Sequence, residues 1–223
     1  MDASSAVAAP AKRPRGRPRK TLAERDDGNR RSELLRSAAR LFRRKGFDAT
    51  STRDIAAAVG MRSGSPFYHF KTKGALLYAV MQEGMRSAIG RQRQALEAAA
   101  PVADPVERLR ALVRSHFQIL LGPGSDFVPV MLYEWRSVSA RQRMALAELQ
   151  GEYEAPWLPV LQALARAGLL RGDLKLARLL IFGALNWSVQ WFDRRQAAHL
   201  DDLTEAAVAL FIAVPPATRN GAP

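Results

Sequence analysis

The stretch Ser51–Lys73 reads STRDIAAAVGMRSGSPFYHFKTK, and it predicts two short helices joined by a tight turn. Ser51 is a suitable N-cap, and Asp54 lies three residues later in the capping-box position. Ser63 can cap the second helix. Pro66 fits the first turn of that helix because the N–H groups there have no intrahelical acceptor. A helix-turn-helix of this kind places its second helix in the major groove of DNA.

Both flanks of this stretch are also predicted to be helical. From Arg30 to Lys45, apolar residues recur at three- and four-residue spacing, while arginines occupy the opposite face. Gly46 is a natural end for that helix because glycine adopts the left-handed conformation without strain. After the stretch, a long helix is predicted from Thr72 or Lys73 to about Ala100. We expect it to join the DNA-reading part to the rest of the chain.

The charge of the chain is concentrated in its N-terminal third. The formal net charge is +13, and residues 1–75 hold 18 Lys/Arg against 7 Asp/Glu. Residues 76–223 hold 16 Lys/Arg against 14 Asp/Glu. A strongly basic N-terminal third on an otherwise nearly neutral chain indicates that this third binds a polyanion. The alternative is a basic surface that serves only solubility.

Residues 1–29 are predicted to be a disordered basic arm. The segment Lys12–Lys20 reads KRPRGRPRK, and its prolines, charge repulsion and few apolar groups disfavour a packed structure. Its centre resembles an AT-hook, in which Arg15 and Arg17 would follow the narrow minor groove of A·T-rich DNA while Gly16 allows close approach. The alternative is a generic arm that contacts phosphates without base preference.

Several other classes of function have no support in the sequence. The chain has no cysteine, and its three histidines are far apart and lack metal-ligand spacing. No phosphate-binding glycine loop and no G-x-S-x-G motif occur, so neither catalysis nor a cofactor is expected. The longest uncharged apolar run, Leu179–Phe192, has 14 residues, whereas about 20 are needed to span a bilayer. We therefore expect a cytoplasmic, nucleoid-associated protein with no membrane partner.

The C-terminal two thirds are predicted to be entirely helical, which gives an all-α chain of about nine helices. The segment 127–135 is expected to be interrupted at Pro129, and the segment 140–167 to be one helix bent by Pro156 and Pro159. The remaining helices are expected at 105–121, Leu174–Phe192 and Leu200–Val214. The last two are apolar nearly all the way round, which predicts burial on two sides and a four-helix dimer interface.

A pocket is predicted in this helical part. Pockets are mostly apolar with a few placed polar groups. Asn186 needs a partner or a ligand because an unpaired buried amide costs about 1–3 kcal/mol. Each aromatic candidate can instead be plain core. The candidate lining residues are Phe117, Tyr133, Trp135, Trp157, Asn186, Trp187 and Trp191, with His116, Glu134 and Arg136 as further polar groups.

The order of these features resembles the TetR family of bacterial transcriptional regulators. The resemblance is most specific between Arg30 and Leu77, where Gly46-Phe47, Ser51–Ala56, Tyr68-His69-Phe70 and Lys73 follow one another. A C-terminal stretch, Gly183–Trp187, resembles the members that respond to acyl-CoA or fatty-acid-type effectors; so do Trp191-Phe192, Asp201-Asp202-Leu203 and Tyr133–Arg136.

The resemblance implies DNA contacts at particular positions. Thr52 and Arg53 are expected to meet phosphates, and Lys73 is expected to clamp one. The second helix of the motif is expected to bring small side chains to base edges, with aromatic and imidazole groups near the backbone. The residues expected there are Arg62, Ser63, Gly64, Ser65, Tyr68 and His69.

These expectations define one leading interpretation and two alternatives. The leading one is a homodimeric repressor that binds a palindromic operator and is released by a small hydrophobic effector. The first alternative is a constitutive or architectural DNA-binding protein, and the second is an acyl-handling enzyme. The expected division is 1–29 basic arm, 30–75 DNA-binding domain, 76–216 ligand-binding and dimerisation domain, and 217–223 disordered tail.

Overall fold

A computed structural model describes residues 22–60, 70–99, 104–193 and 199–213 of the chain. Within these ranges nine α-helices and one short 3-10 helix are found, and no strand, as expected of an all-α protein. The elements are α1 (Leu22–Lys45), α2 (Thr52–Ala58), α4 (Lys73–Ala98), α5 (Pro105–Leu121), α6 (Phe127–Glu134), η1 (Trp135–Ser137), α7 (Ala140–Glu154), α8 (Trp157–Arg166), α9 (Leu174–Trp191) and α10 (Leu200–Phe211).

The end of α1 and the N-cap of α2 are where the sequence predicts them. The backbone at Gly46 takes φ +82°, and its N–H bonds the carbonyl of Phe42 at 2.9 Å, which ends α1. The capping box of α2 is confirmed, because Ser51 Oγ accepts from the Asp54 N–H at 3.1 Å while Asp54 accepts from the Ser51 N–H at 2.8 Å. Helix α1 begins at Leu22, earlier than the expected Arg30.

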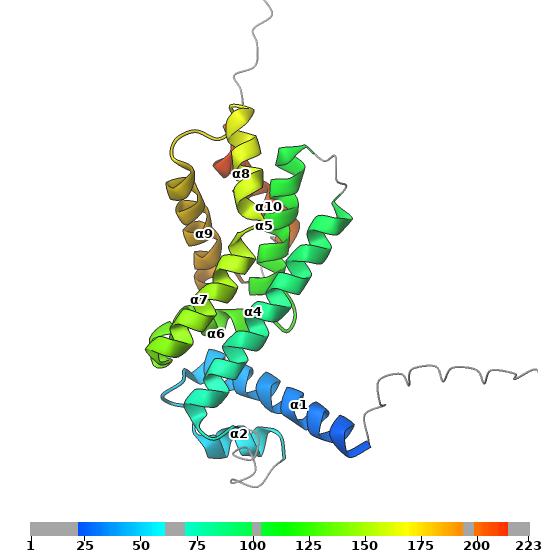
Figure 1. Cartoon of the computed structure of the whole chain (residues 1–223), viewed down its shortest axis with the longest axis vertical. Coiled ribbons are helices and arrows are strands. Elements are labelled where there is room, and N and C mark those ends of the chain that lie inside the picture. The colour runs from blue at the N-terminus through cyan, green and yellow to red at the C-terminus, as the bar shows by residue number, and fades with distance from the viewer. Residues whose placement is uncertain (1–21, 61–69, 100–103, 194–198, 214–223) are drawn as a thin grey trace, which may run out of the picture.

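Helix α4 joins the N-terminal helices to the rest of the molecule, as predicted. Thr72 caps it by accepting from the Ala75 N–H at 3.0 Å. Figure 1 shows α1 and α2 at the base of an upright helical bundle, with α4 running from the base into the bundle. Helix α4 contacts α1 at its lower part and α5, α6 and α7 in the bundle. Any shift of α4 therefore displaces contacts both with the N-terminal helices and with the bundle.

The three prolines expected to interrupt or bend helices lie instead at helix starts. Pro129 lies in the first turn of an unbroken α6, so the expected interruption is wrong. The expected single helix over 140–167 is also wrong, because α7 ends at Glu154 and a separate α8 begins at Trp157, with Pro156 at its N-cap position and Pro159 in its first turn. The first turn of a helix needs no N–H donors, and that is where proline costs least.

The core is continuous from the N-terminal helices into the bundle. One buried cluster includes Leu34 and Ile55 near the base, Leu77 and Met81 on α4, and Trp157 in the bundle. None of the helices in the described part of the chain is long and apolar enough to cross a membrane.

Candidate DNA-binding and effector sites

The N-terminus of α2 presents two of the predicted phosphate contacts. Arg53 is exposed and Thr52 is partly buried. The hydrogen bonds from Ser51 lower the pKa of Asp54, so that carboxylate stays ionised and holds the cap; Lys45 Nζ adds a contact of 3.4 Å. A fixed cap keeps Thr52 and Arg53 in place, but their contact with DNA remains a prediction. The predicted contacts Arg15, Arg17, Arg62, Ser63, Gly64, Ser65, Tyr68 and His69 lie outside the described residues.

Lys73 has an internal role that the sequence did not reveal. Its Nζ donates to the carbonyls of Phe47 at 2.8 Å and Thr50 at 3.0 Å, reaches Asp48 O at 3.5 Å, and lies 4.2 Å from the Phe47 ring centroid. These contacts hold the loop between α1 and α2 against the start of α4. The predicted phosphate clamp is untested, and it would have to share an ammonium that the loop already uses.

Glu134, at the end of α6, ties the same loop to the bundle. Its Oε1 accepts from the Phe47 N–H at 2.8 Å, and its Oε2 accepts from Ser137 Oγ at 2.8 Å. Nearby, Arg43 on α1 donates to Asp126 Oδ1 at 3.1 Å and to the Ser125 carbonyl at 3.0 Å. Glu134 therefore serves the junction between the two parts of the chain rather than a pocket.

A hydrogen-bonded network occupies the centre of the bundle. His116 bonds Tyr153 Oη through Nδ1 at 2.8 Å and Asn186 Oδ1 through Nε2 at 3.1 Å. Because the Asn186 oxygen can only accept, Nε2 carries the proton and Nδ1 accepts from the tyrosine hydroxyl. Gln92 extends the network by donating to the Tyr153 carbonyl at 2.7 Å and accepting from Trp157 Nε1 at 3.1 Å.

Burial sets the protonation of this network. It lowers the pKa of His116 to about 4, against a smaller opposite effect of the Asn186 hydrogen bond, and it raises the pKa of Tyr153. Both groups are therefore neutral near pH 7, which suits an uncharged or weakly polar ligand group. Sequence reasoning proposed His116 and Asn186 but missed Gln92 and Tyr153, since nothing in their local pattern separates them from surface residues.

A small cavity of about 40 Å³ lies beside the network. Of the predicted pocket residues, His116 and Asn186 line it. Phe117 and Trp157 are fully buried core, Trp135 is partly buried, and Tyr133 is 46% exposed. Trp187 is 65% exposed and lies away from the cavity. The cavity walls come from α4, α5, α6, α7 and α9, at Met85, Ala88, His116, Ile119, Val128, Met131, Leu132, Gln150, Tyr153, Glu154, Phe182 and Asn186.

Helix α9 exposes an apolar stripe. Its members recur at three- and four-residue spacing and are half to three quarters exposed: Leu176, Leu179, Leu180, Trp187 and Trp191. Leu210 on α10 is 83% exposed. Contiguous apolar surface of this kind marks an interaction site. The described residues contain no cluster of three or more His, Cys, Asp or Glu that could hold a metal ion.

Two family models match this chain. The model described as "Bacterial regulatory proteins, tetR family" matches residues 34–80, and the model described as "Tetracyclin repressor-like, C-terminal domain" matches residues 102–214. The chain belongs to the TetR family. It is a helix-turn-helix transcriptional repressor that binds operator DNA, responds to a small ligand and self-associates.

Similar proteins cover most of this TetR-family chain. The HTH-type transcriptional repressor KstR2 of Mycolicibacterium smegmatis is 31% identical over 169 residues, or 74% of this chain and 80% of KstR2. The crystal structure of superantigen PfiT is 40% identical with a TM-score of 0.68, covering 82% of this chain and 96% of PfiT. AibR in complex with isovaleryl coenzyme A and operator DNA is 25% identical with a TM-score of 0.74, covering 82% of this chain and 97% of AibR.

Proposed function

We propose that this TetR-family repressor is released from a palindromic operator when a largely apolar effector, an acyl-CoA, enters the cavity beside His116. The observation that carries the proposal is the position of α4. One stretch of this helix lines the cavity through Met85 and Ala88. The first residue of the same helix, Lys73, holds the loop between α1 and α2. A ligand that moves α4 therefore moves the DNA-binding helices.

The effector must enlarge the cavity in order to bind. A volume of about 40 Å³ is close to what one or two water molecules need, far less than an acyl group. Two of the walls are methionines, Met85 and Met131, whose flexible side chains can change rotamer at low cost. We place the apolar part of the effector against these methionines and its carbonyl near His116 and Asn186, in exchange for one of their mutual hydrogen bonds.

Coupling between the two sites then follows from linkage. If the effector favours a shifted α4, it weakens operator binding, and the operator weakens effector binding by the same factor. Couplings of this kind are typically about 5- to 150-fold. AibR, in its solved complex, holds isovaleryl coenzyme A and operator DNA together, so in that protein the two ligands do not exclude each other.

We further propose the division of labour along the chain. Residues 1–29 form a basic arm whose last part, from Leu22 on, is continuous with α1; 30–75 form the DNA-binding domain, 76–216 the ligand-binding and dimerisation domain, and 217–223 a tail. The stripe on α9 pairs with that of a second copy, which sets two recognition elements about 34 Å apart. Thr52 and Arg53 are the proposed phosphate contacts among the described residues, and Lys73 supports them by holding the loop between α1 and α2. The chromosomal operator places the protein in the cytoplasm, at the nucleoid.

We propose no catalytic activity for the chain. The matching families and the curated relative are transcriptional regulators. His116 is the buried imidazole of the described part, and its two nitrogens are held by Tyr153 and Asn186. A general base needs an unprotonated nitrogen that is free to take a proton from a substrate, and the accepting nitrogen of His116, Nδ1, is already bonded by the Tyr153 hydroxyl.

A gel-shift titration tests the proposal. The DNA upstream of the chain's own gene is bound to the purified protein, and acyl-CoAs of graded chain length are added. We expect at least one to weaken operator binding by about 5-fold or more, in line with typical couplings. Free CoA without an acyl group is the control and should leave the complex intact. Operator affinity that no acyl-CoA changes would contradict the effector assignment.

A further inference from the structure

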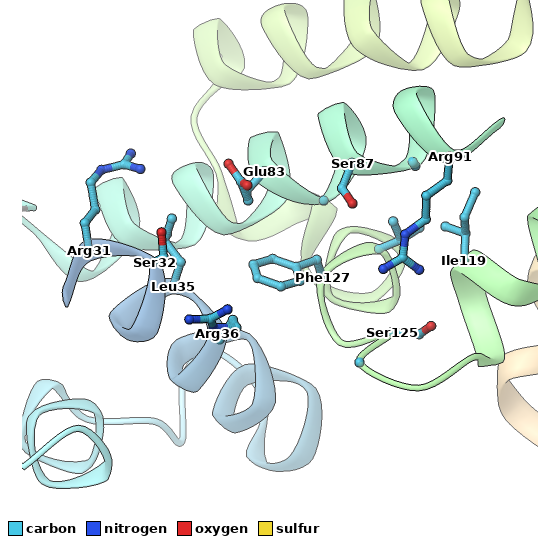
Figure 2. Close-up of a pocket in the computed structure, with 14 residues that line it drawn as sticks. Arg31, Ser32, Leu35, Arg36, Glu83, Ser87, Arg91, Ile119, Ser125 and Phe127 are labelled. Carbon is cyan, nitrogen blue, oxygen red and sulfur yellow. The ribbon is translucent and has the colours of Figure 1, made fainter. Parts of the chain in front are cut away.

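A second, larger recess lies where α1, α4 and the start of α6 meet (Figure 2). Its volume is about 220 Å³, and Phe127 and Ile119 form part of its apolar lining. Figure 2 shows Arg36 from α1 and Arg91 from α4 extending toward it on either side of Phe127. A basic rim over an apolar floor suits an anion that carries an apolar group.

The two arginines are available to a ligand. Neither Arg36 nor Arg91 has a hydrogen bond or ion pair with another residue of the described part of the chain. Arg31, also at the recess, lies over the Phe70 ring at 5.2 Å from its centroid. Glu83 is the one carboxylate among the described lining residues, so the recess has a positive balance. Paired guanidinium groups bind phosphate well because their donors match its oxygens.

The recess and the interior cavity lie back to back. Ala88, Ile119 and Val128 line both of them, so a single layer of side chains separates the two spaces. None of these three side chains is larger than isoleucine. A modest movement of Ile119 or Val128 would join the recess to the cavity beside His116.

We infer that this recess is the headgroup site of the effector: phosphates bind between Arg36 and Arg91, and the apolar tail passes the shared wall into the interior cavity. The inference rests on the proposed acyl-CoA response and assigns that ligand's charged end. The headgroup would then touch α1 and α4 at once. Ligand binding would thus act directly on the junction between the DNA-binding helices and the bundle, in addition to enlarging the cavity.

Calorimetric titration of the full-length protein tests this assignment. The probes are butyryl-CoA and butyryl-pantetheine, which carries the same acyl thioester without phosphates. Arg36→Ala and Arg91→Ala should each weaken butyryl-CoA binding by about 5- to 10-fold and leave butyryl-pantetheine unchanged. Arg36→Lys keeps the charge but not the planar guanidinium, so its affinity for butyryl-CoA should lie between those of the wild type and Arg36→Ala. Because both arginines are exposed, these variants should fold, and their thermal midpoints check that.

Two control variants sharpen the test. Arg40 on α1 is exposed and hydrogen-bonded to Ser37, and Arg40→Ala should bind butyryl-CoA like the wild type. Arg93 on α4 borders a different groove, beside Glu97 and Tyr153. Wild-type affinity in both Arg36→Ala and Arg91→Ala, or a loss confined to Arg93→Ala, would overturn the headgroup site while leaving the effector class intact. A wild-type protein that binds no acyl-CoA of any chain length would overturn both.

Discussion

Lys73 joins the loop between α1 and α2 to α4, the helix that we propose responds to the effector. Lys73→Met would remove donors from the carbonyls of Phe47 and Thr50 and the cation from the Phe47 ring. We expect a loss of about 1–3 kcal/mol in the free energy of unfolding and a weaker operator complex. Thermal melts and fluorescence anisotropy measure the two effects. Lys71→Met, at an exposed neighbouring position, is the matched control.

The salt dependence of the same variant separates the two roles of Lys73. If its ammonium also clamps a phosphate, as the sequence predicts, the slope of log affinity against log salt falls by about one. If its role is the internal one seen in the structure, affinity falls while the slope stays the same. The internal contacts favour the second result.

His116 gives the bundle a specific response to acid. Its pKa of about 4 in the fold lies below its ordinary value of 6.5, so the unfolded chain binds the extra proton between these values. Stability from this group is complete above pH 6.5 and is lost as pH falls toward 4, by up to about 1.4 kcal/mol per unit. Denaturant unfolding of the wild type and His116→Asn from pH 7 to 4.5 measures the difference. If the free energies of unfolding of the two proteins change with pH in parallel, His116 is not buried in its neutral form.

Gly84 sets how closely two elements, α4 and α6, approach. A Cβ at this position would lie 2.7 Å from Phe127 Cβ and 3.1 Å from its carbonyl carbon, both on α6. Gly84→Ala should therefore push the helices apart, costing about 1–3 kcal/mol and weakening the response of operator binding to effector. Gly90→Ala on the same helix meets nothing within 4 Å and should be neutral or stabilising by up to about 1 kcal/mol. Equal melting temperatures for the two variants would contradict this packing.

The helix boundaries show which features could be predicted from the sequence and which could not. Caps were predictable because they depend on neighbours within four residues, as in the Ser51–Asp54 box and the stop at Gly46. The split between α7 and α8 was missed because, from sequence alone, Pro156 is equally consistent with a bend within one helix and with the start of a second helix. The Lys73 and Glu134 contacts join residues 23 to 87 positions apart, and no local pattern encodes such pairs.

For the candidate effector site, the sequence indicated two polar residues that line the cavity but did not show which aromatic side chains face it. His116 and Asn186 were proposed as polar groups of a mostly apolar pocket, Asn186 also because a buried amide needs a partner, and the two side chains bond each other. The tryptophans were chosen by residue type, which does not tell the inward face of α9 from the outward one. Trp187 lies on the outward face, where it belongs to the exposed stripe.

At the scale of the whole molecule, we propose that the stripe on α9 forms the interface for self-association. Leu180 is 73% exposed and Trp187 65% exposed, so a charge at either position is harmless to a monomer but costly in an apolar interface. Leu180→Glu combined with Trp187→Glu should give monomers in sedimentation velocity and a much weaker operator complex. Met144→Glu, at a position on α7 that is 70% exposed, is the control and should remain dimeric. A double variant that stays dimeric would place the interface elsewhere.

Reciprocal coupling is the most direct test of the central claim that an effector and the operator act on each other through α4. The acyl-CoA that weakens operator binding most is titrated calorimetrically into the free dimer and into the dimer saturated with operator. The account predicts that operator weakens acyl-CoA binding by the same factor by which acyl-CoA weakens operator binding, about 5- to 150-fold. An acyl-CoA affinity that is identical in the free and operator-bound dimers would contradict it.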